Sequence, residues 1–207
     1  MLEQCYNKML KQCYNKETYT LSLATDYDLL LKDLPLNIKI IIFEDDKTYL
    51  FSKFNQTVDN LFSKFNQKVD NLPSSLTHLT FGPHFNETVD NLPSSTHLTF
   101  GYSFNQKVDN LPSNLTYLTF GGYFNQSVDN LPSSLTHLTF GLIFNQKVDN
   151  LPSSLRHLTF GRKFNQKVDN LPLNLKEIKI WKTHVHLYQM KIPFGCKVVD
   201  ENNMEIL

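Results

Sequence analysis

The chain has 207 residues, with twenty basic and twenty acidic side chains and therefore no net charge. This balance disfavours a nucleic-acid-binding or membrane-surface protein, because such proteins usually carry a basic excess or a long basic stripe. The sequence shows no signal-peptide-like segment and no apolar run long enough to span a membrane. We therefore expect an intracellular protein whose length suits one domain with a substantial core.

Cysteine usage points to the same compartment. The chain has three cysteines, Cys5, Cys13 and Cys196, which is an odd number without a metal-type CxxC pair. This pattern predicts free thiols in a reducing compartment rather than a disulfide framework. We therefore expect a cytoplasmic location.

The N-terminal third departs from the pattern of the rest of the chain. Residues 1–33 are predicted to form an irregular N-terminal segment or cap. Residues 34–39 resemble residues 171–176, and each segment leads into an apolar run that is typical of a strand. We interpret the two as the first and last turns of a repeated structure, since the ends of a solenoid depart from the consensus. The duplicated segment within residues 51–71 predicts either a bulged loop or an irregular first coil.

From residue 65 to about residue 170 the sequence repeats a unit of about twenty residues, of the form FNQxVDNLPSSLTHLTFG. A period of this length indicates a solenoid, in which each unit forms one coil and stacks on its neighbours. Residues 34–180 are therefore predicted to form one solenoid, and residues 181–207 to form a C-terminal cap. One unit is shorter, because Ser95 runs directly into Thr96 and the leucine equivalent to Leu76 is missing.

Each unit is predicted to contain one short strand. In Thr-His-Leu-Thr-Phe, Leu79 and Phe81 point to one side and His78 and Thr80 to the other, which is the alternation of a half-buried strand. The glycine that follows, Gly82 in this unit, indicates either a left-handed backbone angle or a close backbone approach. One strand per coil predicts a parallel sheet with strands about 4.8 Å apart.

Two sets of side chains are predicted to hold the coils together. Six apolar residues are spaced so that all can point into one coil: Leu72, Leu76, Leu79, Phe81, Phe85 and Val89. The asparagine of each Phe-Asn pair is expected to form a ladder of amides that bond to the adjacent coil, since a buried amide needs partners. This structural ladder comprises Asn86, Asn105, Asn125, Asn145 and Asn165. The alternative is that these asparagines are exposed turn residues.

The candidate chemical groups favour neither an enzyme nor a metal site. The histidines of one repeat position form a row that is interrupted by Tyr117: His78, His97, His137 and His157. Adjacent imidazoles could share a metal ion, but no carboxylate or cysteine accompanies them in register, so we favour a row of solvated side chains on the strand face. His184 and His186 are interpreted as packing in a terminal strand. The serine pairs lie away from the histidines, so we predict no catalytic residue and no cofactor.

The unit Phe-Asn-Gln followed by Leu-Pro-x-x-Leu-Thr-x-Leu-Thr-Phe-Gly resembles the FNIP repeat, which is found in amoebae and in giant viruses that infect them. The resemblance covers residues 34–180. Leu76-x-x-Leu79-x-Phe81 is also similar to the LxxLxL core of leucine-rich repeats. The resemblance implies a mainly β, leucine-rich-repeat-like solenoid with one short parallel strand per coil and little helix. It also implies a role in protein–protein interaction, in the host cytoplasm if the protein is viral.

Several members of this family carry an F-box before the repeats, which implies substrate capture for a ubiquitin ligase. Residues 1–33 are too few for the several helices of an F-box. A relative of such adaptors is therefore one alternative. A second alternative is an expanded or decaying repeat protein with no defined partner.

The positions that vary between units are the candidate binding residues. The two positions after each strand-end glycine change from small and polar to aromatic, aliphatic and then basic. By the resemblance to leucine-rich repeats, these positions imply recognition on the concave sheet face. The candidate residues are Tyr102, Tyr123, Leu142, Ile143, Arg156, Arg162 and Lys163. Aromatic side chains and arginine are the usual anchors of protein interfaces, so we expect a protein partner.

Overall fold

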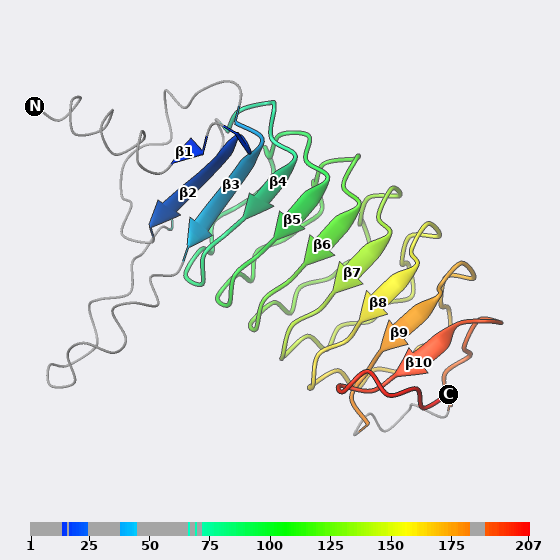
Figure 1. Ribbon diagram of the computed structural model, residues 1–207. Helices are drawn as coiled ribbons and strands as arrows, with labels where there is room; N and C mark the ends of the chain where they lie inside the picture. The colour runs from blue at the N-terminus through cyan, green and yellow to red at the C-terminus, as the bar shows by residue number, and fades with distance from the viewer. Residues whose placement is uncertain are drawn as a thin grey trace, which may run out of the picture.

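The computed structural model describes residues 14–15, 17–24, 38–44, 66, 69, 72–182 and 189–207. Within them the chain forms one ten-stranded sheet whose strands follow one another in chain order (Figure 1). The strands are β1 (Tyr14–Asn15), β2 (Thr20–Ala24), β3 (Ile40–Glu44), β4 (His78–Thr80), β5 (His97–Thr99), β6 (Tyr117–Thr119), β7 (His137–Thr139), β8 (His157–Thr159), β9 (Glu177–Lys179) and β10 (Lys197–Val199). In these parts of the chain there is no α-helix.

Equivalent residues of successive units pair across the sheet. The pairing is parallel from β2 to β10, and only β1 is antiparallel to its neighbour. His78 pairs with His97, for example, and His97 pairs with Tyr117. Each unit therefore contributes one strand and one return segment, which confirms the predicted solenoid of short parallel strands.

The hydrophobic core lies between the sheet and the return segments. All six apolar residues that were predicted to point into one coil are buried, from Phe85 at 0% exposure to Leu72 at 8%. Phe81 at the strand end stacks on Phe85 of the Phe-Asn pair, with ring centroids 3.9 Å apart. The same pair recurs in the following coils, so that two columns of phenylalanine rings run through the core.

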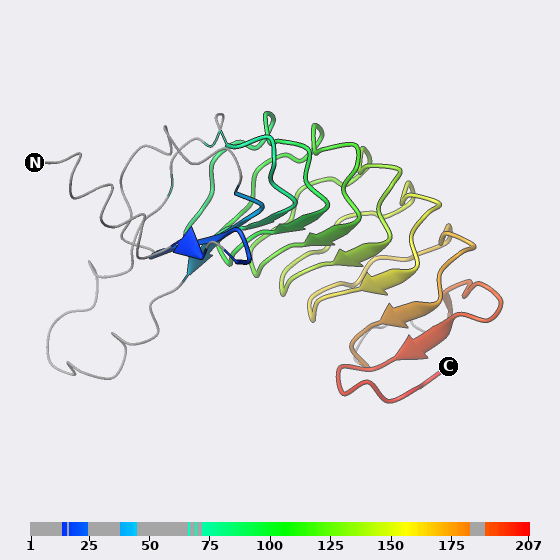
Figure 2. The same ribbon diagram turned by 45° about the horizontal axis from the view of Figure 1, so that its top comes forward.

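The sheet lies on the inner side of a curved solenoid. Ring centroids in adjacent coils are 4.0 Å apart for His78 and His97, on the face of the sheet that points away from the core. The spacing rises to 5.5 Å between Phe81 and Phe100 at the strand ends. It reaches 6.0 Å between Phe85 and Phe104 on the return side. Coils that are closer together at the sheet than behind it make the sheet face concave, and Figure 2 shows the strands inside the arc.

The glycines that end the strands are required by a close backbone approach. A Cβ atom on Gly121 would overlap the carbonyl oxygen of Gly101, and the same clash recurs between Gly141 and Gly121. None of these three glycines has a positive φ. Of the two explanations that the sequence left open, the close approach is correct and the left-handed backbone is not.

The short unit forms a tighter turn. In the other regular coils the leucine N–H donates to the proline carbonyl three residues earlier, as Leu115 does to Pro112. Ser95 takes the place of this leucine and is 1% exposed. Its hydroxyl donates to the carbonyl of Pro93, only two residues earlier, at 3.1 Å. The missing leucine is therefore replaced by a small buried polar residue that bonds locally.

The sheet extends beyond the regular repeats at both ends. At the N-terminal end β2 lies within the segment that was expected to be irregular, and it pairs in parallel with β3. The duplication within residues 51–71 lies outside the described residues except for Asn66 and Val69, and Cys5 and Cys13 lie outside them as well. Cys196 is a buried free thiol. In the described part of the chain, no helical segment has the length and apolar character that a membrane span requires.

The last residues cover the C-terminal edge of the sheet. The N–H of Ile206 donates to the carbonyl of Val198, and the N–H of Val198 donates to the carbonyl of Leu207. The buried Asp200 carboxylate fixes the turn between them, because it accepts the backbone N–H of Met204 at 2.8 Å. Its other oxygen lies 2.6 Å from Lys182 Nζ, and hydrogen bonding to this ammonium group lowers the pKa of Asp200.

Candidate interaction surface

The concave face carries a row of stacked aromatic rings across β4–β8. The row consists of His78, His97, Tyr117, His137 and His157. Neighbouring ring centroids are 4.0 to 4.4 Å apart. The imidazoles are half-buried, because each ring covers the face of the next. The strand that follows places Glu177 beside His157, so the row ends at a carboxylate.

Threonine hydroxyls orient most of these imidazoles. The residue before each of three histidines is a threonine whose Oγ1 lies within hydrogen-bond distance of the ring Nδ1. The distances are 2.8 Å for Thr77 and His78, and 2.9 Å for Thr96 and His97 and for Thr136 and His137. Burial lowers the pKa of His97 and of His137, and the charge of the neighbouring histidines lowers it further. The environment therefore favours the neutral imidazole at His97 and His137.

No metal centre is assembled from these side chains. In the described ranges, no group of three or more histidine, cysteine, aspartate or glutamate residues is placed to hold a metal ion. His184 and His186 lie outside the described residues. The stacked rings direct their faces at one another, which leaves only their edges toward solvent.

The variable residues lie in the turns that follow the strands, beside the concave face. We call these turns the turn ridge, comprising Tyr102, Gly122, Tyr123, Leu142, Ile143, Arg162 and Lys163. Backbone hydrogen bonds join each turn to the next. They run from the N–H of Tyr123 to Tyr102 O at 2.8 Å, from Ile143 to Gly122 O at 3.0 Å and from Lys163 to Leu142 O at 2.9 Å. The ridge therefore continues the stacking of the coils along the row of C-terminal strand ends (Figure 1).

Exposed apolar side chains gather on three successive turns of this ridge. Tyr102 is 49% exposed, Tyr123 is 48% exposed and Leu142 is 40% exposed. The two tyrosine rings are 4.6 Å apart and tilted by 53°. A hydrogen bond to Tyr123 raises the pKa of the Tyr102 hydroxyl. Gly122 is buried beneath the Tyr102 ring, and a Cβ there would overlap this ring.

The basic candidates do not form one cluster. Arg162 and Lys163 are exposed and follow β8, and the Arg162 guanidinium lies 5.7 Å from the centroid of the Trp181 ring. Arg156 precedes β8. An extended chain advances about 3.3 Å per residue, which puts Arg156 about 20 Å from Arg162 along the strand direction. The structure therefore separates Arg156 from the turn ridge and places it at the N-terminal ends of the strands.

The return side of the coils carries ladders of polar side chains. From Asn86 to Asn145, the Oδ1 atom of each Phe-Asn asparagine accepts the backbone N–H of the equivalent asparagine in the next coil, as Asn125 Oδ1 does from Asn145 at 2.9 Å. The same bond joins Asn86 to Asn105, Asn105 to Asn125 and Asn145 to Asn165. These asparagines are half-buried, apart from Asn165, which is exposed. They therefore lie at the surface of the coil rather than in its interior.

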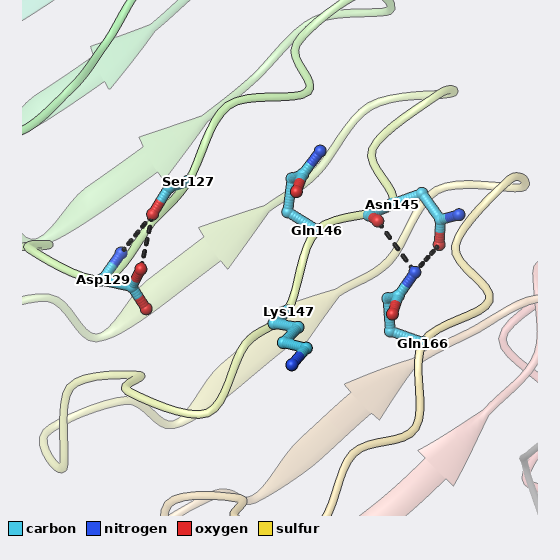
Figure 3. Close-up of a pocket in the computed structure, with 6 residues that line it drawn as sticks. All are labelled: Ser127, Asp129, Asn145, Gln146, Lys147 and Gln166. Carbon is cyan, nitrogen blue, oxygen red and sulfur yellow. Dashed lines mark hydrogen bonds between the residues drawn. The ribbon is translucent and has the colours of Figure 1, made fainter.

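Three further kinds of bond between coils were missed in the sequence. In four coils the glutamine after the asparagine donates to the preceding coil, as Gln166 Nε2 does to Asn145 O at 3.0 Å (Figure 3). Asn150 donates to Asp129 Oδ1 at 3.1 Å. Ser154 in the Leu-Pro turn donates to Leu135 O at 2.6 Å. The one sequence signal of these bonds was that the same polar residues recur in most units.

The small open pocket of Figure 3 is lined by members of these ladders. Its lining residues are Ser127, Asp129, Asn145, Gln146, Lys147 and Gln166. The Ser127 hydroxyl donates to Asp129 Oδ2 at 2.6 Å, and hydrogen bonds from Ser127 and then Asn150 lower the pKa of Asp129. Gln166 Nε2 donates to the carbonyl and Oδ1 oxygens of Asn145 in the adjacent coil. Four of these lining residues, Asp129, Asn145, Gln146 and Gln166, form hydrogen bonds between adjacent coils, so most of the pocket lining has a structural role.

Comparison with known proteins agrees with this geometry. The family model of the FNIP repeat matches residues 65–103, 104–142 and 144–182, which together make up more than half of the chain. This chain belongs to the FNIP repeat family. Each matched stretch spans two coils, so an FNIP repeat corresponds here to two strands and two returns. No curated protein matches the chain. The matching family model describes a repeat and identifies no catalytic domain.

A solved structure shows the same kind of fold. The FNIP chain is similar to the crystal structure of CroV588, described as a novel circular LRR protein structure, with a TM-score of 0.59 and 34% sequence identity. The similarity covers 90% of this chain and 34% of that chain. The FNIP chain thus spans about a third of the length of the protein it matches. The comparison confirms a leucine-rich-repeat-like solenoid.

Proposed function

We propose that this FNIP chain is a non-enzymatic scaffold that binds another protein through its concave sheet face and the adjoining turn ridge. The observation that carries the proposal is the group of exposed apolar side chains on Tyr102, Tyr123 and Leu142. An exposed apolar group on consecutive elements is typical of a protein-binding surface. Membership of a leucine-rich-repeat-like family supports protein binding in general.

The division of labour within each unit supports the same proposal. The repeated residues are occupied with the core and with bonds between coils, as Phe104 and Asn105 are. The turn positions are not needed for that purpose, so their side chains can differ from coil to coil. Tyrosine anchors interfaces well, because it offers a large apolar area at a small loss of side-chain entropy. The cysteine usage and the balanced charge favour a protein partner in the cytoplasm over a nucleic acid or a membrane.

A comparative capture experiment tests the proposal. Tagged wild-type chain and the triple variant Tyr102→Ser, Tyr123→Ser, Leu142→Ser are incubated with the same extract, and the captured proteins are compared quantitatively. We expect the triple variant to lose the proteins that the wild type enriches. Leu173→Ser is the matched control, because Leu173 is 86% exposed but lies in a Leu-Pro turn away from the ridge. Capture of the same set by all three proteins would contradict the proposal and favour a repeat protein without a defined partner.

A further inference from the structure

The turn ridge changes in character along its length. Its first turns carry the exposed apolar side chains of Tyr102, Tyr123 and Leu142, and the next turn carries the exposed Arg162 and Lys163. Backbone hydrogen bonds of 2.8 to 3.0 Å fix these turns at regular intervals. The ridge is therefore one continuous strip with an apolar end and a basic end.

The basic end is open to an anion. Of the three ion pairs among the described residues, none involves Arg162 or Lys163. The neighbouring ammonium of Lys182 differs, because Asp200 already neutralises it at 2.6 Å. Trp181 supports the guanidinium of Arg162 from below at 5.7 Å, which limits the orientations of the side chain. A guanidinium held in this way is suited to bidentate contact with a carboxylate.

The apolar end is ordered before any partner binds. The Tyr102 ring covers Gly122 and contacts the Tyr123 ring, with centroids 4.6 Å apart. Glycine leaves room for the ring in this position, since a Cβ there would displace it. Two rings that are held against each other lose little freedom on binding, which favours their use as anchors.

We propose that the turn ridge binds an extended acidic segment of a partner protein, with apolar side chains on the tyrosine end and carboxylates on Arg162 and Lys163. The proposal rests on the proposed function and specifies its partner. Three coil steps lead from Tyr102 to Arg162, which is about 15–18 Å at a spacing of about 5–6 Å per coil, close to the 5.5 and 5.6 Å between strand-end phenylalanines of adjacent coils. An extended peptide advances about 3.3 Å per residue, so about five positions separate a carboxylate on Arg162 from the apolar residue that contacts Tyr102, in either chain direction.

A selection from random peptides tests this assignment, because it lets the ridge choose its own ligand. A library of random twelve-residue peptides displayed on phage is selected on the immobilised full chain, and an enriched peptide is synthesised with a fluorescent label. We expect the enriched peptides to carry an apolar residue and an aspartate or glutamate about five positions apart, in one consistent order. Their binding, measured by fluorescence anisotropy, should weaken as salt rises.

Three double variants assign the binding to each end of the ridge. Arg162→Glu with Lys163→Glu should weaken the labelled peptide on the order of tenfold or more, and Tyr102→Ser with Tyr123→Ser should do the same. The matched control is Arg156→Glu with Lys176→Glu, which reverses the same number of exposed charges at the N-terminal ends of the strands, away from the ridge. This control should bind the peptide as the wild type does.

Four results would overturn the acidic-segment proposal. Three come from the selection and the variants: enriched peptides without acidic residues, equal binding by the Arg162 and Lys163 variant, and failure of the library to enrich above an unrelated protein. Heparin binding as tight as that of the peptide would also overturn it, because the ridge would then select any polyanion. Peptides that need Tyr102 and Tyr123 but ignore Arg162 and Lys163 would leave the proposed function standing and remove only its acidic partner.

Discussion

At the scale of single residues, the repeated polar letters are explained by bonds between adjacent coils. Asn125 Oδ1, for instance, accepts the backbone N–H of Asn145, and Gln146 donates to the carbonyl of Asn125. Each such bond contributes about 1 kcal/mol net, while an unpaired buried partner costs more than the bond contributes. Because the ladder runs through every coil, one substitution leaves a partner unpaired in the next coil. This explains why the same letters recur in each unit.

The histidine row predicts that acid destabilises the fold. The pKa values of His97 and His137 are lower in the folded chain than their usual value of 6.5. The unfolded chain therefore binds more protons than the folded chain once the pH falls toward 6.5, and the free energy of unfolding decreases from that point downward. Replacing both residues with tyrosine, which already fills the row at Tyr117, should reduce the loss of melting temperature between about pH 7.5 and pH 5.5.

Two comparisons check this origin of the acid sensitivity. Tyr117→His adds a fifth imidazole to the row and should increase the loss of melting temperature over the same pH range. Asp200 does not interfere, because its pKa is lowered from a usual value of 3.8, and its contribution is lost only at more acidic pH. An unchanged acid sensitivity in the His97→Tyr, His137→Tyr variant would show that the row is not responsible.

At the scale of the element, the short coil at Ser95 lacks the core leucine of the other regular repeats. A leucine fills this position in the neighbouring coils, where Leu76 is 1% and Leu115 is 0% exposed. Inserting a leucine between Ser95 and Thr96 restores the regular spacing and a buried apolar side chain. Since removing a core leucine costs about 2–5 kcal/mol, we expect the insertion to raise the melting temperature by several degrees in a thermal unfolding experiment.

The regular coils provide the control for this insertion. A leucine inserted after Ser134 has no vacancy to fill, because Leu135 already occupies the core with 0% exposure. That variant should melt at a lower temperature than the wild type. A fall or no change for the insertion after Ser95 would mean that its tight turn cannot accommodate the core leucine.

The alternation within each unit was sufficient to predict its strand and its core. Leu79 and Phe81 alternate with His78 and Thr80, and a repeat places equivalent residues in register, so the sheet follows from one unit. The strand β2 was not predicted, because Thr20–Ala24 has no counterpart in the repeat. Residues that occur once give no periodic signal, and their pairing depends on contacts with distant parts of the chain.

The candidate surface was predicted in part. The variable pairs lie in adjacent turns because a repeat brings equivalent turns side by side, and their role in binding stays a prediction. Their position beyond the strand ends, rather than on the sheet face, depends on how short the strands are. Arg156 and Arg162 are both basic and close in sequence, which suggests one group. They lie at opposite ends of a strand, however, because β8 runs between them.

At the scale of the whole molecule, curvature and edge protection follow from the way the coils stack. Ring centroids of adjacent coils are 4.0 to 4.4 Å apart in the histidine row and 6.0 to 6.1 Å apart in the column of Phe85 and its equivalents. The coils are therefore closer together on the sheet side, and the solenoid bends around the sheet. A curved open sheet has two edge strands whose backbone groups could pair with another chain. β1 lies antiparallel along one edge, and the C-terminal tail lies along the other.

Removal of the tail tests whether it protects that edge. Without residues 205–207, the N–H and carbonyl of Val198 lose their partners at 3.1 and 2.8 Å and become an open strand edge. We expect the truncated chain to self-associate through β10, with a mass that exceeds that of the full chain and rises with concentration in sedimentation velocity experiments. Glu205→Ala is the control, because it removes the exposed ion pair with Lys197 at 3.4 Å but keeps the backbone bonds. Its mass should equal that of the wild type, since an exposed ion pair contributes little. A truncated chain whose mass stays equal to that of the full chain at every concentration would show that the tail is not what keeps the edge from pairing.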